Sequence, residues 1–119
     1  MNVADILEQA AEVVEQGWCQ GNLMLWDSND NVVARCLVGA IDYVAPHTNS
    51  QYVYDALANH LNLSGVDPRR PIGAVGAVAG NLAAWNDAPG RRVDEVTDAL
   101  RLTAKELRNR AGETGDHDG

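Results

Sequence analysis

The sequence predicts a mainly α-helical (α+β) fold, a compact bundle of about five helices with one β-hairpin between the first and second helices. Three observations predict it. Apolar residues recur at three- and four-residue spacing near both ends of the chain, as on amphipathic helices. A polar cluster divides two short apolar runs after the first helix, as in a hairpin. Hydrophobic residues make up 45% of the sequence without a single Phe, so we expect a core of Leu, Val, Ile and Ala.

One domain accounts for the chain. At 119 residues, the chain can bury roughly two thirds of the surface that its unfolded form exposes. We expect residues 1–111 to form a single globular domain. Residues 112–119, with the sequence GETGDHDG, offer nothing to bury, so we expect them to form a disordered acidic tail.

The charge balance and the N-terminal residues exclude several classes of protein. The net charge is −8, which repels a phosphate backbone, so no nucleic-acid partner is predicted. The N-terminus carries Asp5 and Glu8 and lacks the basic start and apolar run of a signal peptide. No apolar run reaches membrane-spanning length. We therefore expect a cytoplasmic protein without a membrane partner, in which Cys19 and Cys36 are reduced thiols.

The first helix is expected from about Val3 to Gly17. Asn2 can cap its start and Gly17 can end it. Polar residues separate the apolar positions, so one apolar stripe faces the core. The stripe consists of Val3, Ile6, Leu7, Ala10, Val13 and Val14.

Residues 22–35, NLMLWDSNDNVVAR, predict the hairpin. The turn is placed over Asp27 to Asn31, because Asn and Asp tolerate left-handed conformations. Two strands alone are at best marginally stable in water, so the hairpin is expected to lie on the helices. The turn matches only the first half of a calcium loop, because Val32 stands where the glycine belongs and Val38 where the glutamate belongs.

Two helices are expected in the middle of the chain. A short buried helix opens at Cys36 and is closed by Pro46. The next begins at a Ser50 cap and carries an apolar stripe through residues 53–61. A loop over residues 66–71, VDPRRP, follows.

The next helix, over residues 72–85, contains Gly73, Gly76 and Gly80. Each glycine costs roughly 1 kcal/mol relative to Ala inside a helix. We expect close approach of a neighbouring backbone at Gly76 and Gly80 to offset this cost. This helix is therefore placed at the centre of the bundle.

A corner is expected at residues 85–92, between the glycine-containing helix and the last helix. Pro89 and Gly90 fit the two central positions of a type II turn, where Pro presets φ and Gly takes a positive φ. Trp85 is large enough to anchor the end of the preceding helix. This interpretation makes the stretch a rigid bend.

The polar side chains of the corner have two interpretations. Asn86 and Asp87 can bond freed backbone groups, and Asp87 can also meet Arg91 or Arg92. The same side chains can instead face a partner, as can the hairpin turn. The candidate binding residues are Asn86, Asp87, Arg91, Arg92, Asp27 and Asn29.

The last helix is expected from about Arg92 to Ala111. Its first turn is acidic and its final turns are basic, which complements the helix dipole at both ends. The charged residues concerned are Asp94, Glu95, Lys105, Arg108 and Arg110.

Cys36 is the sharpest candidate for catalysis. At a helix start the dipole lowers a thiol pKa, and His47 or His60 could act as the base. The apolar neighbours of Cys36 indicate instead that it faces the core, where a structural cysteine is the commoner outcome. His60 is likewise better explained as a packed histidine. The cysteines and histidines follow no zinc spacing, so no metal and no cofactor is predicted.

Three motifs carry a resemblance to a known family. They are Trp-Cys-x-Gly at 18–21, Cys-x-x-Gly-Ala at 36–40 and Trp-Asn-Asp-x-Pro-Gly-Arg at 85–91. Over about residues 3–110 the chain resembles an uncharacterised family, a domain of unknown function met in actinobacteria and their phages. The resemblance implies such a source and no activity. Where the family has Thr the chain has Arg92, so the capping box with Glu95 lacks its first member.

These observations predict a small acidic, non-enzymatic protein that binds a host or phage protein. The alternative is a cysteine-dependent enzyme that uses Cys36 with His47 or His60. A homo-oligomeric structural protein is the third hypothesis.

Overall fold

The computed structural model describes residues 2–45, 49–63 and 75–116. The described part contains five helices with a two-stranded hairpin between the first two, so the predicted fold class is confirmed. The elements are α1 (Val3–Gln16), β1 (Met24–Trp26), β2 (Val32–Arg35), α2 (Leu37–Val44), α3 (Ser50–His60), α4 (Val75–Asn86) and α5 (Val93–Asp116).

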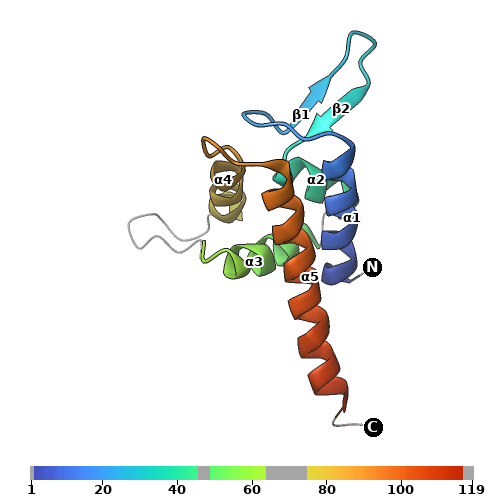
Figure 1. Ribbon diagram of the computed structural model, residues 1–119, viewed down its shortest axis with the longest axis vertical. Coiled ribbons are helices and arrows are strands. Elements are labelled where there is room, and N and C mark those ends of the chain that lie inside the picture. The colour runs from blue at the N-terminus through green and yellow to red at the C-terminus, as the bar shows by residue number, and fades with distance from the viewer. Residues whose placement is uncertain (1, 46–48, 64–74, 117–119) are drawn as a thin grey trace.

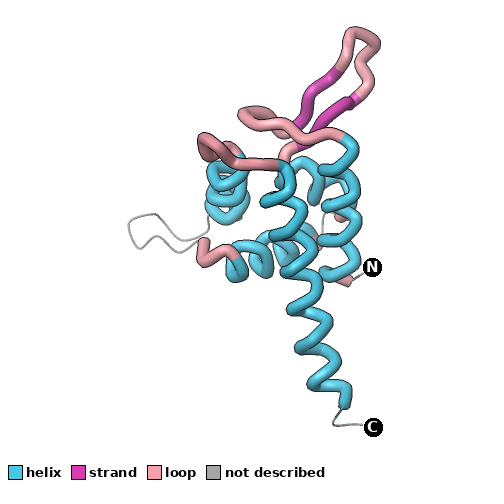
Figure 2. The backbone as a smooth tube through the Cα atoms, viewed as in Figure 1, coloured by secondary structure: helices cyan, strands magenta, loops and turns pink. Residues whose placement is uncertain are grey.

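Helices α1 and α5 lie side by side along the body of the molecule (Figure 1). Helices α2 and α3 pack against this pair, and α4 stands at the edge, where it contacts α2 and α3. Figure 2 shows two projections from the helical body, the hairpin at one end and the C-terminal part of α5 at the other. The hairpin therefore extends beyond the layer that holds the core.

The start and end of α1 follow the predicted signals. The Asn2 side chain accepts a hydrogen bond from the backbone N–H of Asp5 at 2.9 Å. At the other end, the N–H of Gly17 donates to the Val14 carbonyl at 3.1 Å. One face of the helix is buried, as predicted. Its buried residues are Ala4, Ile6, Leu7, Ala10, Ala11 and Val14.

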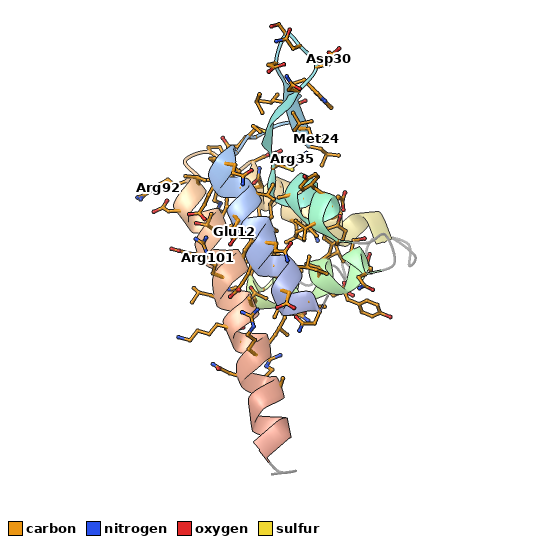
Figure 3. The ribbon with its side chains drawn as sticks, turned by 90° about the vertical axis from the view of Figure 1, so that its right-hand side faces the viewer. Glu12, Met24, Asp30, Arg35, Arg92 and Arg101 are labelled. Atoms are coloured by element: carbon orange, nitrogen blue, oxygen red, sulfur yellow. The ribbon has the colours of Figure 1, made fainter. Side chains whose placement is uncertain are left out.

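The core is aliphatic, as the composition predicts. The largest fully buried side chains include Ile6, Leu7, Leu37, Ile41, Leu57, Leu82 and Leu100. At the rim, arginines of α5 reach acidic residues of α1 (Figure 3). Arg101 pairs with Glu15, and Arg108 pairs with Glu8 and, at 2.8 Å, with Asp5. These ion pairs run along the packed α1 and α5 surfaces.

The predicted hairpin is confirmed, but its predicted position on the helices is wrong. β1 and β2 pair antiparallel, with Leu25 opposite Ala34. Only the base is held to the body, where the Arg35 N–H donates to the Gly17 carbonyl at 3.0 Å. The arms and turn project away from the helices (Figure 1). The hairpin is therefore held to the helices at its base, and the helices do not cover it along its length as predicted.

The central position predicted for the glycine-containing helix is also wrong. A Cβ added at Gly80 would meet no atom within 4 Å, so no neighbouring backbone approaches there. The close approaches lie at Gly17 and Gly39. A Cβ at Gly17 would overlap the Val33 carbonyl oxygen, and one at Gly39 would overlap the Leu23 carbonyl oxygen.

The last helix is longer than predicted. α5 ends at Asp116 and not at Ala111. Gly112 is tolerated because one glycine costs a helix only about 1 kcal/mol relative to Ala, and no proline follows. The single domain over residues 1–111 and the disordered tail from residue 112 stay predictions, and α5 itself reaches Asp116.

Ser50 is the first residue of α3 and not its cap. Asn49 precedes the helix and makes no side-chain capping hydrogen bond. Other predictions concern positions outside the described residues. These are Pro46, His47, the 66–71 loop, Gly73 and the surroundings of Gly76.

Candidate functional site

The corner after α4 contains the predicted type II turn. The Ala88 carbonyl accepts a hydrogen bond from the Arg91 N–H at 3.0 Å, across Pro89 and Gly90. Gly90 has a φ of 81°, the left-handed conformation that this turn requires at its third position. Any residue with a Cβ would be strained there.

The side chain of Asn86, at the end of α4, is fully buried, with an exposed fraction of 0%. Its Oδ1 accepts from the indole N–H of Trp18 at 2.7 Å and from the backbone N–H of Leu37 at 3.1 Å. Its Nδ2 donates to the Cys19 carbonyl at 3.1 Å and to the Asp87 carboxylate at 3.0 Å. Asn86 thus joins its own corner to two distant chain segments, at residues 18–19 and at residue 37, and its side chain does not face solvent.

The segment after α1 adds further hydrogen bonds to the corner. The Gln20 side-chain amide donates to the carbonyls of Asn86 at 2.9 Å and Ala88 at 3.2 Å. The N–H of Gly21 donates to the Asp87 carboxylate at 2.9 Å. In the described part of the chain, the partners of Asp87 are therefore Gly21 and Asn86, and not the arginines of the corner that the sequence predicts.

The two arginines serve the corner and the start of α5. The Arg91 guanidinium lies 3.9 Å from the centre of the Trp85 ring, and its Nε donates to the Trp85 carbonyl at 2.9 Å. It also pairs with Glu95 at 3.2 Å. Glu95 accepts from the Arg92 N–H at 2.9 Å, so the glutamate half of the capping box persists without the threonine. The exposed Arg92 side chain pairs with Asp94 at 2.6 Å.

The three sequence motifs meet around Asn86. The first supplies Trp18 and Cys19, the second supplies Leu37, and the third supplies Asn86 itself. Gly39 of the second motif lets α2 approach the segment before β1. One buried hydrogen-bonded centre therefore explains why these residue types stand at these positions.

A family model matches residues 1–106, a range that contains all three motifs. Its description is a family of unknown function, DUF6197. The chain belongs to this family. No curated protein and no solved structure matches the chain. The range that DUF6197 covers includes every residue that meets at Asn86 and the whole hairpin.

The hairpin turn of this DUF6197 chain satisfies its own polar groups. The Asp27 carboxylate accepts from the N–H groups of Asn29 at 2.8 Å and Asn31 at 3.0 Å. These hydrogen bonds hold the pKa of Asp27 below its ordinary value. Figure 3 places Asp30 at the tip and Arg92 on the helical body. The two predicted binding surfaces are therefore separate.

Apolar side chains on the hairpin are exposed, a feature that the sequence analysis missed. The exposed fractions are 41% for Leu25, 56% for Trp26 and 51% for Val33. We call these three residues the hairpin patch, although the consecutive residues Leu25 and Trp26 direct their side chains to opposite faces of the hairpin. The sequence analysis missed this exposure because it expected the helices to cover both apolar strands.

Cys36 stands at the predicted helix start, and its burial agrees with the interpretation that it faces the core. Its Sγ accepts from the Gly39 N–H at 3.4 Å as the cap of α2. The thiol is buried, and this burial raises its pKa above the ordinary value, although hydrogen bonds from Gly39 and Val38 act in the opposite direction. The expectation of a lowered thiol pKa is wrong, because desolvation outweighs the helix start.

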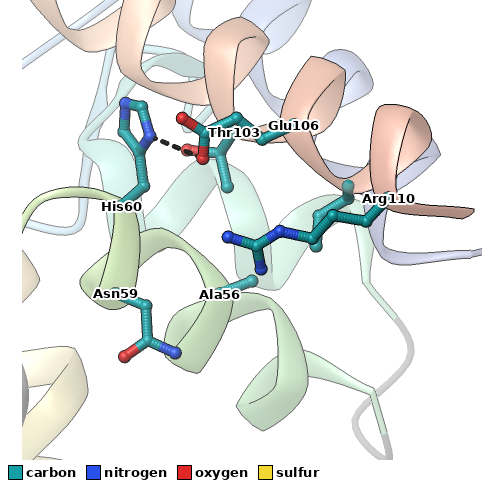
Figure 4. Close-up of a pocket in the computed structure, with 7 residues that line it drawn as sticks. Ala56, Asn59, His60, Thr103, Glu106 and Arg110 are labelled. Carbon is teal, nitrogen blue, oxygen red and sulfur yellow. Dashed lines mark hydrogen bonds and ion pairs between the residues drawn. The ribbon is translucent and has the colours of Figure 1, made fainter. Parts of the chain in front are cut away.

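His60 lies in a groove between α3 and α5 (Figure 4), where its Nδ1 is 3.1 Å from the Glu106 carboxylate. The groove has a volume of about 410 Å³ and is lined by Ala56, Asn59, His60, Thr103, Glu106, Leu107 and Arg110. Sequence reasoning missed Glu106, because 46 positions separate it from His60. The described partner of His60 is thus a carboxylate and not a thiol.

The described residues contain no group of three or more His, Cys, Asp and Glu side chains that could hold a metal ion. None of their helices combines the length and apolar character needed to cross a membrane.

Proposed function

We propose that this protein is a small, acidic, non-enzymatic protein that binds another protein through the hairpin patch. The observation that carries the proposal is the exposure of Leu25, Trp26 and Val33 on a hairpin that projects from the helical body. Exposed apolar surface that is contiguous marks interaction sites, and this hairpin exposes apolar side chains on both of its faces. Tryptophan is also among the residues that contribute most to binding energy at interfaces.

The charge around the patch supports a basic partner. The hairpin carries Asp27 and Asp30 near its tip, its arginine Arg35 is half-buried at the base against the Tyr43 ring, and the whole chain carries a net charge of −8. Such a field accelerates encounter with a surface of the opposite sign. The proposed partner surface is therefore an apolar site flanked by Lys and Arg.

The proposal includes the source that the motifs suggest. The partner would be a cytoplasmic host or phage protein. By binding it, this protein would block or redirect the partner's activity. The corner at residues 85–92 supports such a role less well than the hairpin does. Asn86 is buried, Asp87 accepts from Gly21, and Arg91 stacks on Trp85.

Affinity capture with three forms of the chain tests the proposal. The forms are the wild type, a Trp26→Ser, Val33→Ser double variant, and a Tyr52→Ser control. Tyr52 is 66% exposed on α3, so the control removes a comparable aromatic side chain elsewhere. Circular dichroism first establishes that each form is folded.

The proposal predicts a protein that is retained by the wild type and the control and is lost by the double variant. The purified partner should then bind the wild type at least about tenfold more tightly than the double variant, since a central aromatic contributes 2 kcal/mol or more in many interfaces. An identical set of retained proteins for all three forms would contradict the proposal.

A further inference from the structure

We propose that the partner binds as an extended, basic and apolar chain segment that adds as a third strand to the open edge of β1. This inference rests on the proposed function and specifies how the hairpin contacts its partner. An added strand gains affinity from main-chain hydrogen bonds and specificity from alternate side chains.

The hydrogen bonds of the hairpin define which edge of β1 is open. The Leu23 carbonyl accepts from the Cys36 N–H at 3.0 Å, and the Asp27 N–H donates to the Asn31 carbonyl at 2.9 Å. Both bonds point toward β2. Because strand residues two apart direct their backbone groups to the same side, Leu25 also faces β2.

The backbone groups of Met24 and Trp26 therefore point the other way. In the described part of the chain, the sheet has two strands and β1 pairs only with β2. The N–H and C=O groups of these two residues are thus available to an incoming strand. Trp26 contributes its exposed side chain next to the same edge.

The outer edge of β2 is different. The Gly17 carbonyl accepts from the Arg35 N–H at 3.0 Å, and the Cys19 N–H donates to the Arg35 carbonyl at 3.3 Å. This pairing covers β2 at the base of the hairpin. The register irregularity also lies on β2, where Val33 is skipped between the partners of Leu25 and Trp26.

β1 is short, with three residues, and a register irregularity lies beside it, but its edge lacks the side-chain protection against strand addition. Natural edge strands are commonly blocked by Lys, Pro or an inward-pointing charge. Residues 22–26, NLMLW, contain none of these. The acidic residues Asp27 and Asp30 follow directly, so an added strand with Lys or Arg beside its apolar positions is the complementary occupant.

A peptide probe tests this inference on the full chain. A displayed library of short random peptides is selected against the wild type, and the tightest peptide is synthesised. Single N-methyl groups are then placed at each peptide position in turn, because an N-methyl group removes one backbone donor without changing the side chain. Binding is measured by isothermal titration calorimetry to the wild type, Trp26→Ser and the Tyr52→Ser control.

Strand addition to Met24 and Trp26 predicts that N-methylation weakens binding about tenfold at two peptide positions, two residues apart, and little at the other positions. It also predicts a basic peptide whose affinity falls with Trp26→Ser and not with Tyr52→Ser. A Trp26-dependent peptide that tolerates N-methylation throughout would overturn strand addition and leave the proposed function standing. A selection that yields no peptide dependent on Trp26 would also overturn strand addition, whereas the proposed function is overturned by identical capture with all three forms of the chain.

Discussion

The hydrogen bonds of Asn86 explain the residues found at several other positions of the chain. Its amide accepts from Trp18 and Leu37 and donates to Cys19 and Asp87. The sequence analysis gave the Asn86 side chain two possible roles at the corner, a hydrogen bond to the backbone or a contact with a partner. It could not choose between these roles, because the groups that bond to Asn86 lie 49 and 68 positions away in the sequence.

The first prediction concerns this amide. Asn86→Ala leaves the Trp18 indole and the Leu37 N–H without their acceptor in a buried site, so the free energy of unfolding should fall by about 3 kcal/mol. Urea unfolding measures the change. Asn59→Ala is the matched control, because Asn59 is exposed on α3 and its loss should stay within about 0.5 kcal/mol. A loss below about 1 kcal/mol for Asn86→Ala would show that the described bonds do not fix the corner.

The second prediction concerns Cys36, whose thiol pKa is raised above its ordinary value of 9.0 mainly by burial. A raised folded-state pKa contributes stability that is fully present below the unfolded pKa and is lost as pH rises through the folded value. The difference in unfolding free energy between the wild type and Cys36→Ala should therefore shrink as pH rises above 9.0. Chemical unfolding at neutral and alkaline pH measures it, and a constant difference would mean that the thiol is not desolvated.

At the scale of the element, the sequence predicted α1 well and α4 poorly, for one physical reason. An amphipathic stripe and its caps are local, so Asn2 and Gly17 mark the ends of α1 without reference to the rest of the chain. The reason for a glycine lies in its neighbours. Gly80 faces open space, whereas Gly39 lies against the Leu23 carbonyl.

The third prediction compares these two helical glycines. Gly80→Ala should stabilise the protein by about 0.5–1 kcal/mol, because Ala favours the helix and its Cβ meets nothing. Gly39→Ala should destabilise it by about 2 kcal/mol, because its Cβ overlaps backbone that cannot move freely. Thermal unfolding of the two variants measures both effects. Shifts of the same sign would contradict the described packing of α2.

The same contrast applies to the hairpin. Its two apolar runs and its Asn/Asp turn were sufficient to predict strands, turn and position along the chain. They were not sufficient to predict that its arms project, because hydrophobicity indicates which residues favour burial and not what covers them. The exposure of Leu25, Trp26 and Val33 was for this reason not predicted.

At the scale of the whole molecule, a rigid helical body carries a projecting hairpin. The body is held by α1 and α5, by an aliphatic core and by the bonds around Asn86. The sequence predicted the five helices and the hairpin between the first two, but neither the projection of the hairpin nor the meeting of the three motifs at one centre. On this account the motifs maintain the fold, and the hairpin performs the binding.

The fourth prediction concerns the acidity of the chain. If the partner surface is basic, the rate at which the partner associates with this protein should fall steeply with ionic strength. The rate at which the complex dissociates should change little. Stopped-flow measurements at several salt concentrations with the captured partner separate the two rates. An association rate that does not respond to salt would contradict the proposed basic partner.

The central claim is that the hairpin, and not the corner, is the contact surface. Hydrogen–deuterium exchange of the chain with and without its captured partner tests this most directly. The account predicts that binding slows exchange in residues 22–34 and leaves residues 85–92 unchanged. Slower exchange at residues 85–92 with an unchanged hairpin would contradict the account and would assign the contact to the corner.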